Sequence, residues 1–331
     1  MTDRFTDYDN DLESQPTFED SLEELKNDSE SLPSPALIVG LSELSSEQLA
    51  QLGPIWEGLS RDYRRILMQM LVDAAASNFM LNFQPIGYAT LTSEEADVRQ
   101  AAIELLAEDE TTGLFRTLID MVQNDPEDFV RAEAARSLGR FILGGEMGDF
   151  NDNIVETAQN TLLRIIANEK EDIQVRRFAV EAIANCTRDE VPKVIAEAYR
   201  NPDSTMRLSA IIAMGRSYDE RWEDKVLDEL TNTDDDMRIA AIQSAGELQL
   251  STAVGQIIKN ITDGEREEQE VAIVALGEIG GKEALRILQS LQDGAEETDD
   301  SDLLEIIDDA MASASLINGD HMMVNFTDLE D

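Results

Sequence analysis

The sequence is poor in several residue types that many functions require. It contains one cysteine, Cys186, and one histidine, His321, among 331 residues. A single cysteine excludes an intramolecular disulfide and a cysteine-based zinc site. Only 5% of the residues are aromatic, so we expect a core built mainly from Leu, Ile, Val, Ala and Met.

Basic residues are also scarce, with 26 Lys and Arg against 70 Asp and Glu and a formal net charge of −44. This charge repels nucleic acids and anionic membranes, because binding to phosphate needs clustered Lys and Arg. No apolar run approaches the roughly 20 residues of a membrane span. The chain begins MTDRFTDYDNDLES, which lacks the charged-then-apolar pattern of a signal peptide. We therefore expect a cytoplasmic protein whose partner is another protein with a basic patch.

Acidic segments lie at both ends of the chain. Residues 1–35 contain eleven Asp and Glu, and residues 293–331 contain thirteen without any Lys or Arg. Because low hydrophobicity and high like charge predict disorder, we assign a disordered acidic tail to 1–35 and an acidic tail to 317–331. Solvating tails and docking segments that fold on a partner are both open. Residues 301–316 predict an amphipathic last helix with Ser301 as its N-cap.

Internal repeats occupy the body of the chain, residues 36–316. Each copy contains a Val-Arg or Met-Arg pair in front of an alanine-rich apolar stretch, as in DFVRAEAARSLG. The pairs recur every 31 or 32 residues, except for one interval of 45 that contains a Gly- and Asp-rich insertion at 144–153. A later copy places Glu270 in the arginine position, and RDYRRILMQMLVDAA is a degenerate early copy. Each copy predicts one helix, a short acidic turn and a second helix that begins near the arginine.

The repeated pattern (Asp)-x-x-(Val/Met)-Arg-x-x-Ala, followed by small and aliphatic residues and then Gly, resembles HEAT repeats. The short period and the ALG-type endings look most like the HEAT-like repeats of phycobilisome bilin-lyase subunits and their bacterial relatives. The resemblance extends from Ser45 to Leu316. It implies an all-α fold, a right-handed α-solenoid of about six or seven helical pairs. It also implies that the second helices line the concave face, where solenoids of this kind bind partners.

The repeated arginines are predicted to be structural. Acidic residues precede most of them by three or four positions, in the turn where a carboxylate can cap the second helix. An arginine one turn further on can pair with the acid of its own or the next repeat. The alternative, an outward row that binds anions, is disfavoured by these acids. The predicted structural ladder consists of Arg99, Arg131, Arg176, Arg207, Arg238, Asp128, Asp172, Asp203 and Asp234.

The middle of the chain is nearly neutral. Residues 131–221 carry a net charge of −2, which leaves −42 for the rest. The apolar stripe of the second helix that contains Arg131 places Glu133, Arg136 and Arg140 on its exposed side, and Arg177, Glu181 and Arg216 hold similar positions in later copies. A solvated face is the alternative to a binding face. The residues predicted to bind a partner are Arg136, Arg140, Arg177 and Arg216.

A competing occupant of the same face is the chain itself. The C-terminal segment HMMVNF, residues 321–326, is apolar within an acidic tail. We therefore keep open an intramolecular docking of this tail that blocks the face.

No motif for catalysis is present. The chain lacks a P-loop, a GxGxxG motif and a nucleophile elbow, and one histidine is too few for the di-iron site of HEAT-like hydroxylases. Cys186 ends an apolar helix and is predicted to be buried. GEIGGK at 277–282 predicts a tight turn, and GGEMGDFNDN does not match an EF-hand loop. We expect no catalytic residue, no metal ion and no cofactor.

The function predicted from these features is a non-catalytic scaffold or adaptor that binds a protein along the concave face. The bilin-lyase resemblance suggests a second possibility, an accessory or chaperone-like subunit of a tetrapyrrole lyase or another modifying enzyme. The charge alone suggests a third, an acidic chaperone for a basic protein.

Overall fold

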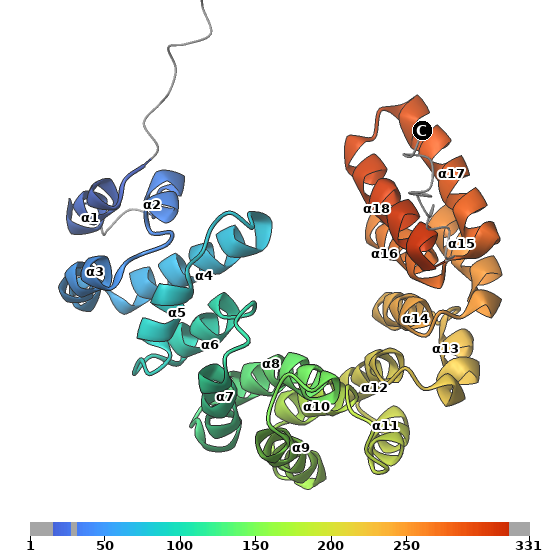
Figure 1. The fold of residues 1–331 in the computed structure, drawn as a ribbon, viewed down its shortest axis with the longest axis horizontal. Helices are drawn as coiled ribbons and strands as arrows, with labels where there is room; N and C mark the ends of the chain where they lie inside the picture. Colours follow the sequence, from blue (N-terminus) through green and yellow to red (C-terminus); the bar gives the residue numbers. More distant parts are fainter. Residues whose placement is uncertain (1–15, 28–31, 318–331) are drawn as a thin grey trace, which may run out of the picture. The chain divides into compact units, whose positions relative to one another are not determined.

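The computed structural model describes residues 16–27 and 32–317. Within these residues the chain forms eighteen α-helices and two short 3-10 helices, without a β-strand (Figure 1). The chain divides into two compact units, one ending at Leu138 and one beginning at Gly139. The division falls inside helix α8 (Asp128–Met147).

Unit 1 contains alternating helices in two layers. Helix α4 packs against α6, α2 against α4, and in the other layer α1 packs against α3 and α3 against α5. Leu67, Leu71 and Ile103 are completely buried in its core. Its helices are α1 (Phe18–Asn27), α2 (Pro35–Gly40), α3 (Ser46–Gly58), α4 (Arg61–Ser77), α5 (Gln84–Thr90), α6 (Ala96–Leu105), α7 (Thr112–Asn124) and the first part of α8.

Helix α1 corrects the prediction of a disordered tail over the whole of 1–35. Its residues Phe18, Leu22 and Leu25 are buried, and the helix packs against α2 and α3. The carboxylate of Glu24 accepts hydrogen bonds from the backbone N–H and the hydroxyl of Ser34, at 2.9 and 2.7 Å. The prediction failed because it used only the charge of the segment. The one-turn spacing of its apolar residues, which predicts a helix with one buried side, was not taken into account. Residues 1–15, 28–31 and 318–331 lie outside the described residues.

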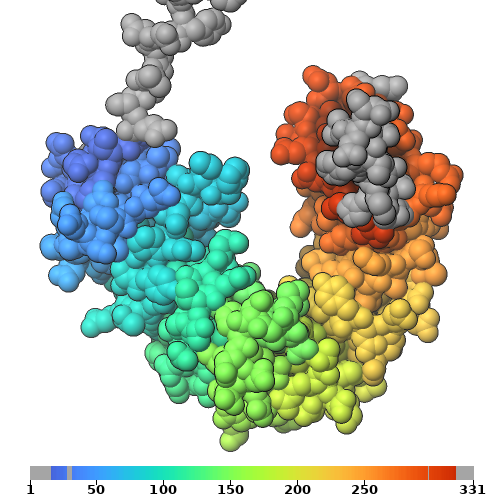
Figure 2. All heavy atoms as spheres, viewed as in Figure 1, coloured from blue at the N-terminus to red at the C-terminus, as the bar shows by residue number. Residues whose placement is uncertain are grey.

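Unit 2 repeats the same arrangement over the rest of the chain. The even-numbered helices, here called second helices, pack side by side in the order α10, α12, α14, α16, α18. The odd-numbered first helices lie against them on one side, and successive repeats are packed without a break (Figures 1 and 2). Its helices are the end of α8, α9 (Asp152–Ala167), α10 (Ile173–Ile183), α11 (Val191–Tyr199), α12 (Ser204–Arg216), α13 (Glu223–Glu229), α14 (Asp235–Glu247), α15 (Val254–Asp263), α16 (Arg266–Ile279), α17 (Gly281–Thr298) and α18 (Ser301–Ile317).

The predicted all-α solenoid is confirmed, with more helical pairs than the six or seven expected. The additional pairs are at the ends: α1 with α2, and α17 with α18. Neither pair contains the Val/Met-Arg signature on which the copies were aligned. Pairs without the signature still bury apolar faces, so alignment on one residue undercounted them.

The insertion at 144–153 is folded. Helix α8 continues through it as far as Met147, and the ring of Phe150 packs against that of Phe141, with 5.4 Å between their centroids. A Cβ atom at Gly144 would lie 2.8 Å from Cε2 of Phe150. Glycine is therefore needed here because the returning chain touches the helix.

Two local predictions near the C-terminus had different outcomes. GEIGGK does form a tight turn between α16 and α17, with positive φ angles of 66° and 87° at Gly280 and Gly281. The predicted N-cap Ser301 is instead the first residue of α18. The preceding residue Asp300 accepts the hydrogen bond from the backbone N–H of Leu303, at 3.2 Å, so the cap is a carboxylate.

Candidate functional site

Four of the repeated arginines, Arg99, Arg131, Arg207 and Arg238, reach back to the turn before their own helix. Nη1 of Arg207 donates to the carbonyl oxygens of Asn201 and Pro202, six and five residues earlier, at 3.0 and 2.9 Å. These carbonyls follow the end of a first helix, where backbone acceptors lack partners. The same bonds recur at Arg99 and Arg131, and the bond to the carbonyl six residues earlier recurs at Arg238.

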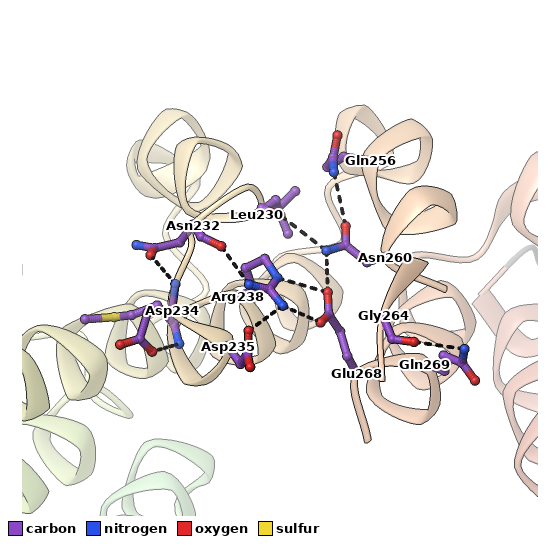
Figure 3. A network of polar contacts seen from close by, with 11 residues as sticks. Leu230, Asn232, Asp234, Asp235, Arg238, Gln256, Asn260, Gly264, Glu268 and Gln269 are labelled. Carbon is purple, nitrogen blue, oxygen red and sulfur yellow. Dashed lines mark hydrogen bonds and ion pairs between the residues drawn. The ribbon is translucent and has the colours of Figure 1, made fainter. Parts of the chain in front are cut away.

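Some of these arginines also pair with a carboxylate from the next repeat. Arg99 forms a bidentate pair with Asp125, at 2.8 and 2.7 Å. Arg238 forms one with Glu268, at 3.1 and 2.7 Å (Figure 3). Arg64, in the degenerate early copy, pairs with Glu95. Each of these pairs connects a second helix to the following repeat.

Glu268 is the center of a buried polar network (Figure 3). Its side chain is 5% exposed, and Nδ2 of Asn260 donates to it at 2.7 Å while also contacting the carbonyl oxygen of Leu230 at 3.3 Å. The hydrogen bonds from Arg238 lower the pKa of Glu268 below its ordinary value, against the opposing effect of burial. A buried carboxylate with these donors is satisfied and remains ionised.

The acids predicted to pair with the arginines cap the helices instead. Asp172, Asp203 and Asp234 each accept hydrogen bonds from backbone N–H groups at the start of a second helix, so their capping role is confirmed. Asp128 is the first residue of α8 and accepts a bond from the N–H of Phe129 at 2.7 Å. Arg238 pairs with Asp235 of its own helix and with Glu268, not with Asp234, and Arg99 pairs with Asp125 of the next repeat. The pairing of Arg131 with Asp128 stays a prediction.

Arg176 departs from the common geometry. Its Nε donates to the carbonyl oxygen of Ile166, ten residues earlier, at 3.2 Å. The turn between α9 and α10 differs in sequence from the Asn-Pro turns, since it reads NEKED.

The arginine position of the last copy is Gln269, not Glu270. Nε2 of Gln269 donates to the carbonyl oxygen of Gly264, five residues earlier, at 3.0 Å (Figure 3). Glu270 pairs with Arg266 on the outside of the helix. The sequence alignment was shifted by one residue because no arginine fixed it in this copy.

The glycines that end the repeated motif lie where successive second helices touch. A Cβ atom at Gly215 would lie 2.8 Å from Cα of Ser244, and one at Gly246 would lie 2.9 Å from Cα of Ala275. Gly277 has the same relation to Ala310, at 2.8 Å. Small residues at these positions therefore allow the close spacing of the second helices.

The four arginines predicted to bind a partner differ in exposure. The side chain of Arg136 in unit 1 is 51% exposed, while in unit 2 those of Arg177 and Arg216 are 18% and 32% exposed and Arg140 is half-buried. The guanidinium groups of Arg140 and Arg177 stack on the rings of the phenylalanines that follow them, 4.6 and 3.9 Å from the centroids. The guanidinium of Arg177 also donates to the side chains of Gln174 and Ser209.

The two acids predicted beside these arginines on the exposed side are buried, which corrects the sequence analysis. Glu133 and Glu181 are 6% and 4% exposed. Glu181 lies between two repeats: it accepts from the hydroxyl of Ser209 at 2.5 Å and from Nη1 of Arg216 at 3.3 Å, and lies 3.7 Å from Arg177. The helical wheel assumed one buried side, but a second helix in a solenoid contacts the second helices before and after it as well.

Two further carboxylates on the second helices were missed. Glu247 of α14 and Glu278 of α16 each follow a motif glycine, and each lies against the glycine of the preceding repeat. Burial raises the pKa of both, and for Glu247 the charge of Glu278 raises it further while that of Arg216 lowers it. The sequence signal was the Gly-Glu pair in SAGE and LGE, at the same position in consecutive copies.

Cys186 is buried, as predicted. Its Sγ donates to the carbonyl oxygen of Ile183 at 3.3 Å, and burial raises the pKa of the thiol to about 11. Such a thiol is protonated at neutral pH and is a poor nucleophile. A Cys–His nucleophile pair would need His321, the only histidine in the sequence. His321 lies outside the described residues.

Neither a metal centre nor a membrane span is found in the part of the chain that the structure describes. In residues 16–27 and 32–317, no three His, Cys, Asp or Glu side chains are grouped as metal ligands. The helices in these same ranges are too short or too polar to cross a membrane.

Comparison with known proteins identifies the repeats. The family described as HEAT repeats matches residues 84–152, which contain α5, α6, α7 and α8. The resemblance to HEAT repeats is thereby confirmed, while the closer resemblance to bilin-lyase subunits stays a prediction. No curated protein sequence matches the chain.

Two solved structures are similar over most of the chain. The YibA protein of Escherichia coli is 18% identical, with 82% of this chain and 98% of that chain covered and a TM-score of 0.40. A chain in a structure of Kap95p with RanGDP is 12% identical, with 89% and 44% covered and a TM-score of 0.39.

Proposed function

We propose that the protein is a non-catalytic scaffold or adaptor that binds a protein partner on its second helices. The observation that carries this proposal is that the arginines at different positions of the second helices differ in their contacts and exposure. Those at the start of the second helices are used by turn carbonyls and by the next repeat, whereas Arg136 and Arg216, further along, keep partly exposed guanidinium groups. HEAT repeats support the proposal, because stacked helical pairs present an extended surface of similar side chains.

The proposed contact residues are Arg136, Arg140, Arg177 and Arg216, in a chain where cations are outnumbered. A partner segment with carboxylates fits them, since Arg forms planar bidentate pairs with carboxylates. Binding on this face also fits the near-neutral charge of residues 131–221, because the rest of the chain repels acidic partners.

The test replaces all four arginines by glutamine together with Glu133→Gln and Glu181→Gln, because Arg136 pairs with buried Glu133, and Arg177 and Arg216 pair with buried Glu181. We expect the variant to fold. In a pull-down from the native cells it should no longer capture the partners that the wild-type chain captures, because its affinity for them falls at least tenfold. The control replaces four exposed arginines elsewhere, Arg65, Arg116, Arg200 and Arg286, by glutamine. Retention of the same partners by the first variant would contradict the proposal.

The accessory role in a tetrapyrrole lyase stays a second candidate through the bilin-lyase resemblance alone. Visible absorbance of the purified protein with added bilin distinguishes it: a shifted and enhanced band supports a tetrapyrrole role, and an unchanged spectrum contradicts it. The acidic-chaperone alternative predicts salt-sensitive binding to any polycation, without dependence on the four arginines.

A further inference from the structure

Three consecutive second helices of unit 2 place matching side chains on their exposed side. One turn apart on each helix lie Ile212 and Arg216 of α12, Gln243 and Glu247 of α14, and Val274 and Glu278 of α16. Residues four apart on a helix share one side. We name Ile212, Gln243 and Val274 the middle row, and Arg216, Glu247 and Glu278 the charged row.

The middle row offers two aliphatic side chains, separated by the amide of Gln243, to solvent. Val274 is 46% exposed, Gln243 is exposed and Ile212 is half-buried. The first helices α13 and α15 pack against α14 and α16, so the middle row is on the side that they leave open. Val274 lies one turn from Glu270 and one turn from Glu278 on α16. Contact with an apolar side chain of a partner would remove its exposed surface from water, which is favourable.

The charged row changes sign along the unit. Arg216 already donates to Glu181, while Glu247 and Glu278 are adjacent like charges, each held against the glycine of the preceding repeat. Oε2 of Glu247 is buried without a hydrogen-bond partner, and its Oε1 accepts from Gln243 at 3.3 Å. Both carboxylates are partly removed from water, so a cation placed over them is attracted more strongly than at a solvated surface.

We propose that this face binds a partner segment in which an acidic residue lies over Arg216, two basic residues lie over Glu247 and Glu278, and apolar residues contact the middle row. Packed helices lie roughly 8–10 Å apart. A peptide in the polyproline II conformation rises about 3.1 Å per residue with three residues per turn, so residues three apart lie on one side and about 9 Å from each other. The matching segment therefore has this conformation, with its charges three residues apart: Glu-x-x-Lys-x-x-Lys, or the same order reversed. The inference rests on the proposed function for the assignment of the second helices as the binding face.

The test uses the full chain and a synthetic array of nine-residue peptides with Leu or Val between the charged positions. Peptides with Glu-x-x-Lys-x-x-Lys in either direction should bind at least tenfold more tightly than peptides with Lys-x-x-Glu-x-x-Glu or with glutamine at the three positions. The double variant Glu247→Gln/Glu278→Gln should lose this preference. The control Glu283→Gln/Glu305→Gln removes two exposed acids from unit 2 and should keep it.

Equal binding of the three peptide classes, absence of binding to all of them, or a preference that survives Glu247→Gln/Glu278→Gln would overturn the inference. These outcomes are separable from failure of the proposed function. Loss of cellular partners in the arginine variant, combined with no peptide preference, leaves the scaffold role in place and removes only this segment. A second readout is the NMR titration of Glu247 and Glu278, whose pKa values should fall when the lysine-containing peptide binds.

Discussion

At the scale of single residues, the decisive feature is which carboxylates have donors. Glu268 is surrounded by Arg238 and Asn260, while Glu247 has one weak bond from Gln243 and a like charge nearby. Burial is unfavourable for both anions, but only Glu268 receives hydrogen bonds that offset it. The two glutamates therefore have opposite effects on stability.

Replacing Glu268 by glutamine should destabilise unit 2 at neutral pH by about 2–4 kcal/mol, because Arg238 loses its buried carboxylate. The folded-state pKa of Glu268 is lowered, so its contribution is present above the ordinary pKa of a glutamate and is lost as pH falls through the folded value. The difference from wild type should thus disappear in acid. Urea unfolding followed by the buried Trp222, in a Trp56→Phe background, measures it; the exposed neighbour Glu267→Gln is the control.

Replacing Glu247 by glutamine should have the opposite effect. Its folded-state pKa is raised, so the ionised group destabilises the fold at neutral pH, and this cost disappears as pH falls through the folded value towards the ordinary one. The variant should melt at a higher temperature than wild type at pH 7 and at the same temperature in acid. A lower melting temperature of the variant at pH 7 would contradict this prediction, because it would mean that hydrogen-bond donors stabilise the ionised Glu247.

At the scale of helices, the close packing of second helices depends on the motif glycines. Gly246→Ala should destabilise unit 2 by about 1–3 kcal/mol, because the added methyl meets the backbone of α16 and the layer must shift. Gly294→Ala in α17 is the matched control, since its Cβ meets nothing within 4 Å and alanine favours a helix by about 0.5–1 kcal/mol. Urea unfolding should show a lower free energy of unfolding for Gly246→Ala and a higher one for Gly294→Ala.

The sequence predicted the positions of the helices better than the burial of their side chains. The Val/Met-Arg pairs placed the second helices because the arginine binds local turn carbonyls, a relation set within about six residues. Burial of Glu181 could not be predicted from one helix, because contacts with the neighbouring repeat bury it. The partner carboxylates Asp125 and Glu268 were missed for the same reason, since each lies 26 or more residues from its arginine.

At the scale of the whole molecule, the charge of −44 and the repeated helices have separate consequences. The charge limits which partners approach, and it weakens with salt. In the proposed function the stacked repeats decide where a partner binds, because the second helices carry the proposed contact arginines and the paired rows of side chains. The arginines at the start of the second helices thus stabilise the fold, and those further along are the proposed contacts with a partner.

This assignment is tested most directly by measuring the affinity for the native partner and the melting temperature in the same variants. Arg131→Ala and Arg207→Ala should each melt several degrees lower, because the turn carbonyls lose their charged donor, and should bind the partner with unchanged affinity below the transition. The variant with glutamine at Arg136, Arg140, Arg177, Arg216, Glu133 and Glu181 should lose affinity. Lost binding with unchanged melting in Arg131→Ala and Arg207→Ala would contradict the account.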